Sequence, residues 1–134
     1  MAQQLDDKTL VSAQIRPEDI PALCDLGVHT IINNRPDGEE PNQPLGADIE
    51  RAAHEAGMTY RHIPIVRGMG PADVEAMSEA IEQCEGKVLA YCRSGTRSAL
   101  AWAVASARSG VPRAEVERKA EAAGVDISLV SHLL

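Results

Sequence analysis

Short apolar runs of strand length alternate along the chain with longer segments in which apolar residues recur every three or four positions. The apolar runs are rich in β-branched and aliphatic residues and predict strands over residues 9–15, 28–33, 58–66 and 87–91. The segments with helical periodicity predict helices over residues 16–27, 45–56, 71–85, 98–109 and 113–123. Because strands and helices alternate, we expect an α/β fold with a central, mostly parallel sheet of about four strands and helices on both faces.

Two of the three cysteines fall on the apolar faces of predicted helices. Cys24 lies near Ile20 and Leu23 on one helical face. Cys84 continues the apolar stripe of the helix that starts at Pro71. We therefore expect both thiols to be buried packing residues without a chemical role.

Length and composition indicate one globular domain that spans residues 1–134. With 44% hydrophobic and 25% charged residues, such a chain buries about two-thirds of the surface that it exposes when unfolded. Aromatic residues make up only 2% of the chain, so it offers no stacking platform for nucleic-acid bases. The net charge of −7 also opposes contact with nucleic acid or an anionic membrane, and an anionic ligand must therefore meet a local positive potential.

The amino-terminal segment carries no basic and apolar leader, and no apolar run approaches the roughly 20 residues that span a bilayer. Three cysteines without CxxC spacing suit a reducing compartment, so we expect a cytoplasmic protein. The four histidines are scattered, and we expect neither a metal nor an organic cofactor. These features leave the oligomeric state open.

The stretch VLAYCRSGTRSALAWAV combines an apolar strand, a turn from Cys92 to Arg97 and a helix of small residues. Backbone N–H groups and the positive end of the helix dipole converge on a cysteine in this position, which favours the thiolate over the thiol. Gly95 permits the left-handed backbone that such a turn needs, and Arg97 offers a planar fork for two oxygens of an anion. The stretch therefore predicts a nucleophile, an anion-binding loop and an arginine clamp.

Two other loops leave the ends of predicted strands and are expected to share one rim with the Cys92 loop. The loop NRPDGEEPNQP carries Arg35 and Asp37, and the loop RGMG carries Arg67. In a parallel sheet, the loops at the carboxyl ends of the strands meet at one edge. We therefore expect these three side chains at the rim of the site, with Asp37 as a candidate acid.

Four segments are distinctive in combination: RPEDIPALCDLG, VHTIINNRPDGEE, YRHIPI and VLAYCRSGTRS. With them, from about Lys8 to Gly124, the chain resembles the bacterial phosphatase-like domain that is also found fused to beta-lactamase-like hydrolases. The resemblance implies the fold of the protein-tyrosine and dual-specificity phosphatases. Members of this family are described either as phosphatase-like or as sulfur transferases.

The resemblance also implies roles for the residues of the loop. Cys92 matches the nucleophile, Arg97 matches the arginine that orients the substrate, and the Ser98 hydroxyl matches a group that stabilises the thiolate. The anion is then held by backbone N–H groups of the loop residues Arg93, Ser94, Gly95 and Thr96.

The spacing within the loop distinguishes two kinds of chemistry. Cysteine-dependent phosphatases carry five residues between the cysteine and the arginine, whereas this chain has four, as rhodanese sulfurtransferases do. One residue fewer removes up to roughly 3.5 Å of chain, so the ring of N–H groups is tighter and holds a phosphoryl group less well. Tyr91 also precedes the nucleophile where phosphatases usually carry histidine. The loop therefore resembles rhodanese loops, although the remainder of the chain does not.

The general acid of a phosphatase has no convincing counterpart in the sequence. In dual-specificity phosphatases an aspartate follows the strand that YRHIPIV resembles, whereas this chain reads RGMG there. Loss of the acid slows the departure of an alkoxide by a factor of about 10² to 10⁴. Asp37 and Asp73 are poor substitutes. Sulfur transfer needs no acid when sulfite or a thiolate leaves, and Arg67 favours an anionic donor.

Three functional hypotheses follow. The favoured one is a sulfurtransferase in which Cys92 takes a sulfane sulfur from a small anionic donor and passes the persulfide sulfur to a thiol, a protein acceptor or cyanide. The alternative is a phosphatase that hydrolyses aryl phosphate esters through a phosphocysteine, because a phenolate leaves readily without acid assistance. A non-catalytic anion-binding module is the weakest hypothesis, because binding alone does not require a thiol.

Overall fold

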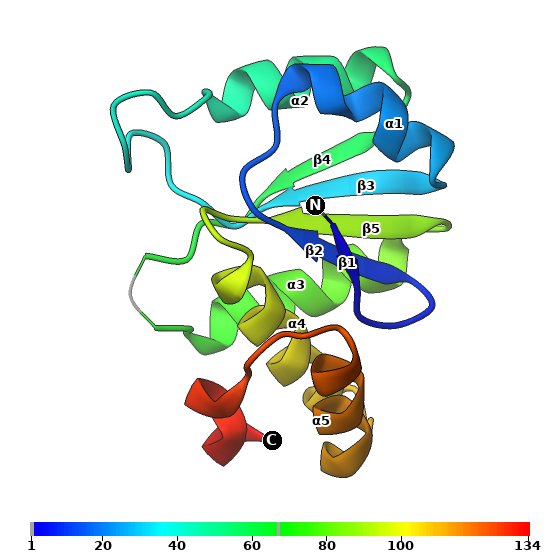
Figure 1. Cartoon of the computed structure of the whole chain (residues 1–134), viewed down its shortest axis with the longest axis vertical. Coiled ribbons are helices and arrows are strands. Elements are labelled where there is room, and N and C mark those ends of the chain that lie inside the picture. Colours follow the sequence, from blue (N-terminus) through cyan, green and yellow to red (C-terminus); the bar gives the residue numbers. More distant parts are fainter. Residues whose placement is uncertain (1, 67) are drawn as a thin grey trace.

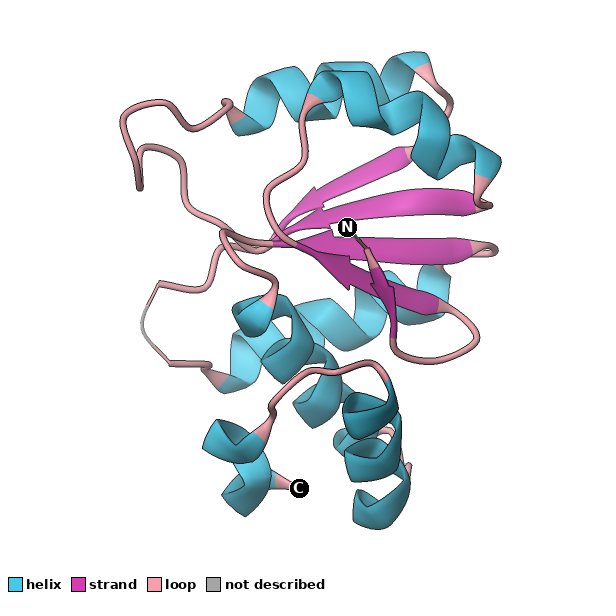
Figure 2. Cartoon of the chain, viewed as in Figure 1, coloured by secondary structure: helices cyan, strands magenta, loops and turns pink. Residues whose placement is uncertain are grey.

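A five-stranded sheet forms the centre of the molecule (Figure 2). The structure is a computed structural model that describes residues 2–66 and 68–134. The strands are β1 (Gln3–Gln4), β2 (Thr9–Ser12), β3 (Val28–Asn33), β4 (Thr59–His62) and β5 (Lys87–Tyr91). Their order in the sheet is β1-β2-β5-β3-β4, and all neighbours are parallel except β1 and β2. The predicted α/β class with a mostly parallel sheet is thus confirmed.

The sheet has one strand more than the sequence pattern predicts. β1 contains only Gln3 and Gln4, which pair with Val11 and Leu10 at the edge beside β2. Because both glutamines are exposed and polar, they carry no hydrophobic periodicity that would indicate a strand. The other four strands lie inside the predicted ranges, and β3 and β5 coincide with them.

Helices cover both faces of the sheet, as predicted (Figure 1). The helical elements are η1 (Pro17–Asp19), α1 (Ile20–Asp25), α2 (Gly46–Glu55), α3 (Pro71–Gln83), α4 (Thr96–Arg108), α5 (Arg113–Ala122) and η2 (Ser128–Leu133). α1 and α2 lie on one face, and α3 and α4 lie on the other. α5 and the 3-10 helix η2 pack against α4. Within the described residues, no helix has both the length and the apolarity that crossing a membrane requires.

Alternation along the strands builds two hydrophobic cores, one on each side of the sheet. In β5, Leu89 belongs to the core with α1 and α2, whereas its neighbour Ala90 belongs to the core with α3 and α4. β3 repeats this alternation with Ile31 and Ile32. Because both faces are covered, these central strands are buried on either side and read in the sequence as continuous apolar runs.

The two cysteines predicted as packing residues differ in their environment. Cys84 is buried in the core with α3 and α4, as predicted. Cys24 is exposed, and the prediction for it is wrong. The buried face of the short helix α1 is formed by Ile20 and Leu23. Cys24 lies at the edge of that face, and α1, with only six residues, does not bury the edge as well.

Candidate active site

The Cys92 loop, residues 92–97, leaves the carboxyl end of β5, the middle strand of the sheet. Cys92 is fully buried, and its sulfur accepts a hydrogen bond from the backbone N–H of Gly95 at 3.1 Å. Gly95 has a φ of 94° and directly precedes α4. A Cβ at this position would lie 3.3 Å from the backbone of Ser12. A side chain is therefore disfavoured here both by the left-handed conformation and by the close approach of the chain after β2.

Arg97 lies in the first turn of α4 and reaches the loop that follows β3. Its Nη1 and Nη2 atoms donate to the two carboxylate oxygens of Glu39 at 2.8 and 2.7 Å, and Nη1 also donates to the Ile65 carbonyl at 3.0 Å. The guanidinium group has five N–H donors, so two remain. Among the described residues, neither the Nε–H nor the second Nη2–H donates to an oxygen or nitrogen atom, and the side-chain contact that remains to Arg97 is with Cys92. Together these two N–H groups form a side-on fork that can bind two oxygens of an anion.

The ion pair between Arg97 and Glu39 holds both groups in their charged forms. The hydrogen bond from Arg97 keeps the pKa of Glu39 below its ordinary value, and Arg35 adds to this effect. The hydrogen bond to Glu39 raises the pKa of Arg97, and interaction with the negative charge of Cys92 raises it further. Arg97 is therefore close enough to stabilise a thiolate at Cys92 while Glu39 holds it in place.

Arg35 lies beneath the rim of the site, in contrast to the prediction that it lines the rim. Its side chain is only 3% exposed and donates through Nε to Glu39 at 2.8 Å and through Nη2 to Glu40 at 2.6 Å. Nη1 donates to the side-chain oxygen of Gln14 at 2.9 Å. The guanidinium therefore ties the loop after β3 to the chain after β2, and each of its three nitrogens, Nε included, has a partner. Arg67, the other arginine expected at the rim, lies outside the described residues.

The aspartates considered as acids both have structural partners. Asp37 accepts a hydrogen bond from the Gly46 N–H at 2.8 Å, at the start of α2. It lines a hollow with Tyr60, and none of the residues described around that hollow belongs to the Cys92 loop. Asp73 accepts a hydrogen bond from a backbone N–H at the start of α3. The structure therefore does not bring Asp37 to the sulfur, although both lie at the same edge of the sheet.

Ser98 is fully buried, and its hydroxyl contacts a residue that the sequence analysis missed. The hydroxyl donates to the side-chain oxygen of Asn34 at 2.8 Å, so its single proton is not directed at the sulfur as expected. Asn34 donates in turn to the Ile63 carbonyl at 3.0 Å, and its backbone N–H donates to the Tyr91 carbonyl at 2.8 Å. Ser98 and Asn34 therefore connect the ends of three strands. The one sequence signal for Asn34 is its place directly after a buried strand.

The remaining residues of the Cys92 loop are held by contacts within the loop and with two neighbouring segments. The Ser94 hydroxyl donates to the Thr96 hydroxyl at 3.1 Å and accepts from the Thr96 N–H at 3.4 Å. The Arg93 carbonyl accepts from the Gln14 N–H at 3.3 Å, and the exposed Arg93 side chain lies 3.4 Å from Glu40. These contacts fix the loop at both of its ends, which preorganises the backbone around the sulfur.

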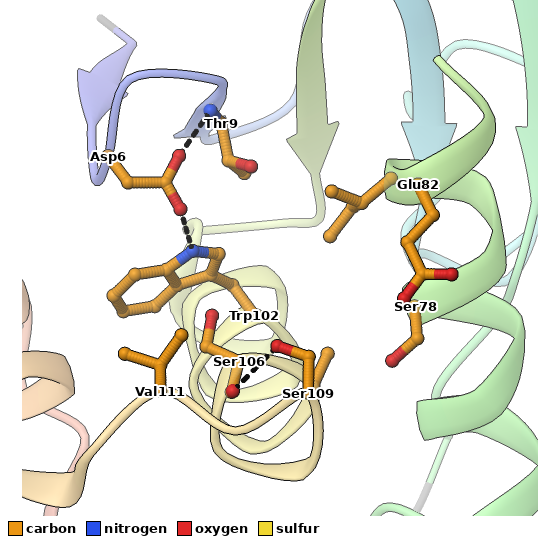
Figure 3. Close-up of a pocket in the computed structure, with 10 residues that line it drawn as sticks. Asp6, Thr9, Ser78, Glu82, Trp102, Ser106, Ser109 and Val111 are labelled. Atoms are coloured by element: carbon orange, nitrogen blue, oxygen red, sulfur yellow. Dashed lines mark hydrogen bonds between the residues drawn. The ribbon is translucent and has the colours of Figure 1, made fainter.

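A second hollow, of about 140 Å³, lies beside Trp102 (Figure 3). Asp6 accepts hydrogen bonds from the Trp102 indole N–H at 2.9 Å and from the Thr9 N–H at 2.7 Å (Figure 3). This carboxylate fastens the turn between β1 and β2 to α4, which is a structural role. In residues 2–66 and 68–134, no group of three or more His, Cys, Asp or Glu side chains is arranged to hold a metal ion.

Comparison with known proteins identifies relatives along nearly the whole chain. The family model described as the phosphatase-like domain of beta-lactamase hydrolase-like protein matches residues 3–109. A beta-lactamase hydrolase-like protein of Xylella fastidiosa (strain Temecula1) is 38% identical over 126 residues, 92% of this chain and 29% of that protein. Its namesake from Agrobacterium fabrum is 33% identical over 138 residues, 99% of this chain and 31% of that protein. The chain thus spans less than a third of these relatives.

Solved structures share the fold. A candidate phosphatase from Neisseria meningitidis is 40% identical, with a TM-score of 0.84 and coverage of 97% of this chain and 93% of that chain. A candidate phosphatase from Shewanella putrefaciens is 25% identical, with a TM-score of 0.71 and coverage of 89% and 76%. Tk-PTP in its active form is 17% identical, and its TM-score of 0.75, with coverage of 98% and 90%, supports the fold alone. The phosphatase-like fold is thus confirmed, and the chain belongs to the phosphatase-like domain family of the beta-lactamase hydrolase-like proteins.

Proposed function

We propose that the chain is a cysteine-dependent phosphatase that hydrolyses aryl phosphate esters through a phosphocysteine at Cys92. The observation that carries the proposal is the pairing of a buried sulfur, which accepts the Gly95 N–H, with an Arg97 that contacts Cys92 and whose side-on fork donates to no oxygen or nitrogen atom among the described residues. Family membership and similarity to proteins described as phosphatases support this alternative over the sulfurtransferase hypothesis that the loop spacing favours.

The reaction takes place in two steps at phosphorus. The Cys92 thiolate attacks the phosphorus atom, an S–P bond forms, the P–O bond to the aryl group breaks, and the phenolate leaves with the electron pair. Water then attacks phosphorus, the S–P bond breaks, and inorganic phosphate and the thiolate are released. In both steps Arg97 and the backbone N–H groups of the loop stabilise the charge on the phosphoryl oxygens.

Among the described residues, neither Asp37 nor Glu39 is placed to act as a general acid, which limits the substrates. Asp37 is bound to the start of α2, and Glu39 is kept ionised by Arg97. Neither carboxyl group is therefore suited to protonate a leaving oxygen. An alkyl phosphate, which expels an alkoxide, should react about 10² to 10⁴ times more slowly than it would with an acid. We therefore propose aryl phosphates, whose phenolate leaves more readily, as the substrate class.

Sulfur transfer is the second candidate, and the spacing of Cys92 and Arg97 favours it. With four residues between them, the anion-binding loop is as short as in rhodaneses. The Cys92 thiolate would attack the outer sulfur of thiosulfate, the S–S bond would break, and sulfite would leave while a persulfide forms. Cyanide or an acceptor thiol would then remove the terminal sulfur and restore the thiolate. Neither step requires an acid.

The cytoplasm is the compartment that we propose for either chemistry. Cys24, Cys84 and Cys92 are all free thiols, and a reducing compartment keeps the nucleophile in this state. The partners are then a small phosphate ester or sulfur donor, together with water, a thiol or a protein as acceptor.

The two chemistries are separated by one set of measurements on the purified protein. We expect wild type to release phosphate from an aryl phosphate, and Cys92→Ser to release none above background. Cys24→Ser, which changes an exposed thiol, is the matched control and should retain the wild-type rate. The mass of the protein after exposure to thiosulfate then tests sulfur transfer. A gain of one sulfur atom at Cys92 that cyanide removes, without Cys92-dependent phosphate release, would replace the phosphatase proposal with the sulfurtransferase.

A further inference from the structure

A groove of about 490 Å³ is lined by Arg97 and by two segments that are distant in the sequence. One wall comes from the chain after β4 and includes Val66 and Met69. The other wall comes from η2 and includes Leu129 and Leu133. Both segments lie near the amino-terminal end of α4 (Figure 1). η2 lies beyond residue 109, where the match to the family model ends, so this wall is outside the matched region.

The groove gathers exposed apolar side chains. Five large hydrophobic residues in the described chain are strongly exposed, and three of them line the groove: Val66 at 72%, Leu129 at 73% and Leu133 at 45%. The other two, Leu26 and Leu45, lie near α1 and α2 on the opposite face of the sheet. Apolar side chains that cluster at one exposed site, rather than scatter, are typical of a binding surface.

The ionisable groups of the groove suit an anionic ligand. The ionisable residues described in its lining are Arg97 and His132, and no carboxylate contributes. In a chain with a net charge of −7, a surface without acidic groups is unusual. Arg97 provides an attachment point for an anion, and the remainder of the groove provides apolar contacts. A ligand that fits both parts has an anionic head and an apolar arm.

We propose that this groove binds the aryl arm of the substrate while the phosphoryl group occupies the Cys92 loop. The inference rests on the proposed function and assigns the part of the site that selects the leaving group. The volume lies within the usual range for small-molecule sites, and the groove is continuous with the anion-binding arginine. It also gives an independent reason for aryl substrates, because an apolar arm is held here whether or not an acid is present.

The test measures binding without turnover. Cys92→Ser protein is titrated by calorimetry with naphthylmethylphosphonate and with methylphosphonate, which share the anionic head and differ in the aryl arm. We expect the naphthyl compound to bind at least about tenfold more tightly, because its ring loses water-exposed apolar surface in the groove. Val66→Asp and Leu133→Asp, placed in the two walls, should each reduce this ratio by about threefold or more. Leu45→Asp, an exposed leucine on the opposite face, should leave it unchanged.

Failure of the groove and failure of the phosphatase proposal give different results. Equal binding of the two phosphonates, or a preference that survives both groove substitutions, would overturn the aryl-arm assignment even if phosphate release is observed. A tenfold preference that both substitutions abolish, without any phosphate release by wild type, would support the groove and remove the phosphatase. A dimer that Leu133→Asp converts to monomer, with no change in the ratio, would show that a second copy covers the groove and would overturn the assignment.

Discussion

The loops that leave β3 and β5 each contribute one arginine that binds the same carboxylate, Glu39: Arg35 from the first and Arg97 from the second. Arg35 has a partner at each of its three nitrogens and is almost fully buried. Arg97 is 24% exposed, and its end-on contact with Glu39 leaves an Nε edge that donates to no oxygen or nitrogen atom among the described residues. The comparison shows that an arginine can bind an anion only where its existing contacts leave one edge of the guanidinium open.

The two loops also balance charge around the sulfur. Three guanidinium groups, those of Arg35, Arg93 and Arg97, meet the carboxylates of Glu39 and Glu40. One positive charge is therefore left over in a protein whose net charge is −7. Because Arg35 is enclosed by its partners, this excess is available to a ligand through Arg97 and the exposed Arg93. The carboxylates of the loop after β3 thus position the guanidinium groups without neutralising the positive charge of the site.

The largest expected effect comes from the arginine with the open edge. Arg97→Lys keeps the charge but loses both forks, so neither Glu39 nor an oxyanion is bound at two points. We expect kcat/KM for an aryl phosphate to fall by a factor of about 10². Arg93→Lys is the control, because the exposed Arg93 side chain contacts only Glu40 at 3.4 Å among the described residues. Its effect should stay within about fivefold. An Arg97→Lys loss that stays within the same fivefold would mean that charge alone, and not the fork, serves the reaction.

Arg35→Met should affect stability more than chemistry. The substitution leaves Glu39, Glu40 and the Gln14 side chain without a buried donor. Because both carboxylates are partly exposed, we expect a loss of about 2 kcal/mol in the free energy of unfolding, less than for a fully buried pair. Denaturant unfolding measures it. Arg51→Met breaks an exposed ion pair with Asp48 and should cost at most about 0.5 kcal/mol. If the two variants lose the same free energy, Arg35 has no supporting role.

The fold could be predicted from the sequence where the signal is local. β3 and β5 coincide with the predicted ranges, because all their residues except His29 and Lys87 are buried between the two layers of helices. The Cys92 loop was likewise visible, since its strand, glycine and helix are consecutive. The two-residue strand β1 and the exposure of Cys24 depend on the surrounding structure and have no local signal.

The partners within the site could not be predicted from the sequence. Asn34 and Ser98 are separated by 64 positions, and Glu39 and Arg97 by 58. Placing the loops on a common rim, as the parallel sheet requires, predicts that such residues are neighbours. It does not specify which acidic residue pairs with which arginine, since Asp37, Glu39 and Glu40 occupy one short loop. The choice depends on backbone geometry, which directs Asp37 to α2 and Glu39 to the site.

Glu39→Gln tests whether the shared carboxylate positions Arg97. At neutral pH the amide can accept only one of the two N–H bonds, so we expect kcat/KM to fall by about fivefold. The lowered pKa of Glu39 means that its stabilising effect is complete above the ordinary value of 4.5 and is lost as the pH falls through the lower value in the folded state. The difference in Tm between wild type and Glu39→Gln should therefore shrink between pH 6 and pH 3.

The matched variant for this test is Glu40→Gln, which keeps the contact between Glu39 and Arg97 intact. It should change kcat/KM less than Glu39→Gln does. A gain in anion affinity on substitution of Glu39 would contradict the positioning role, because it would mean that the carboxylate competes with the substrate for Arg97.

The smallest effect is expected at Ser98, where the structure and the family resemblance disagree. Ser98→Ala removes the donor to Asn34 and leaves a buried amide oxygen without that bond. We expect a loss of about 1 to 2 kcal/mol in stability and a change of less than about threefold in kcat. Ser109→Ala, which removes an exposed hydroxyl bond to a helix carbonyl, is the control for stability. If Ser98 instead stabilises the thiolate, kcat falls by more than tenfold and the pH–rate profile shifts upward, because the thiolate then forms only at higher pH.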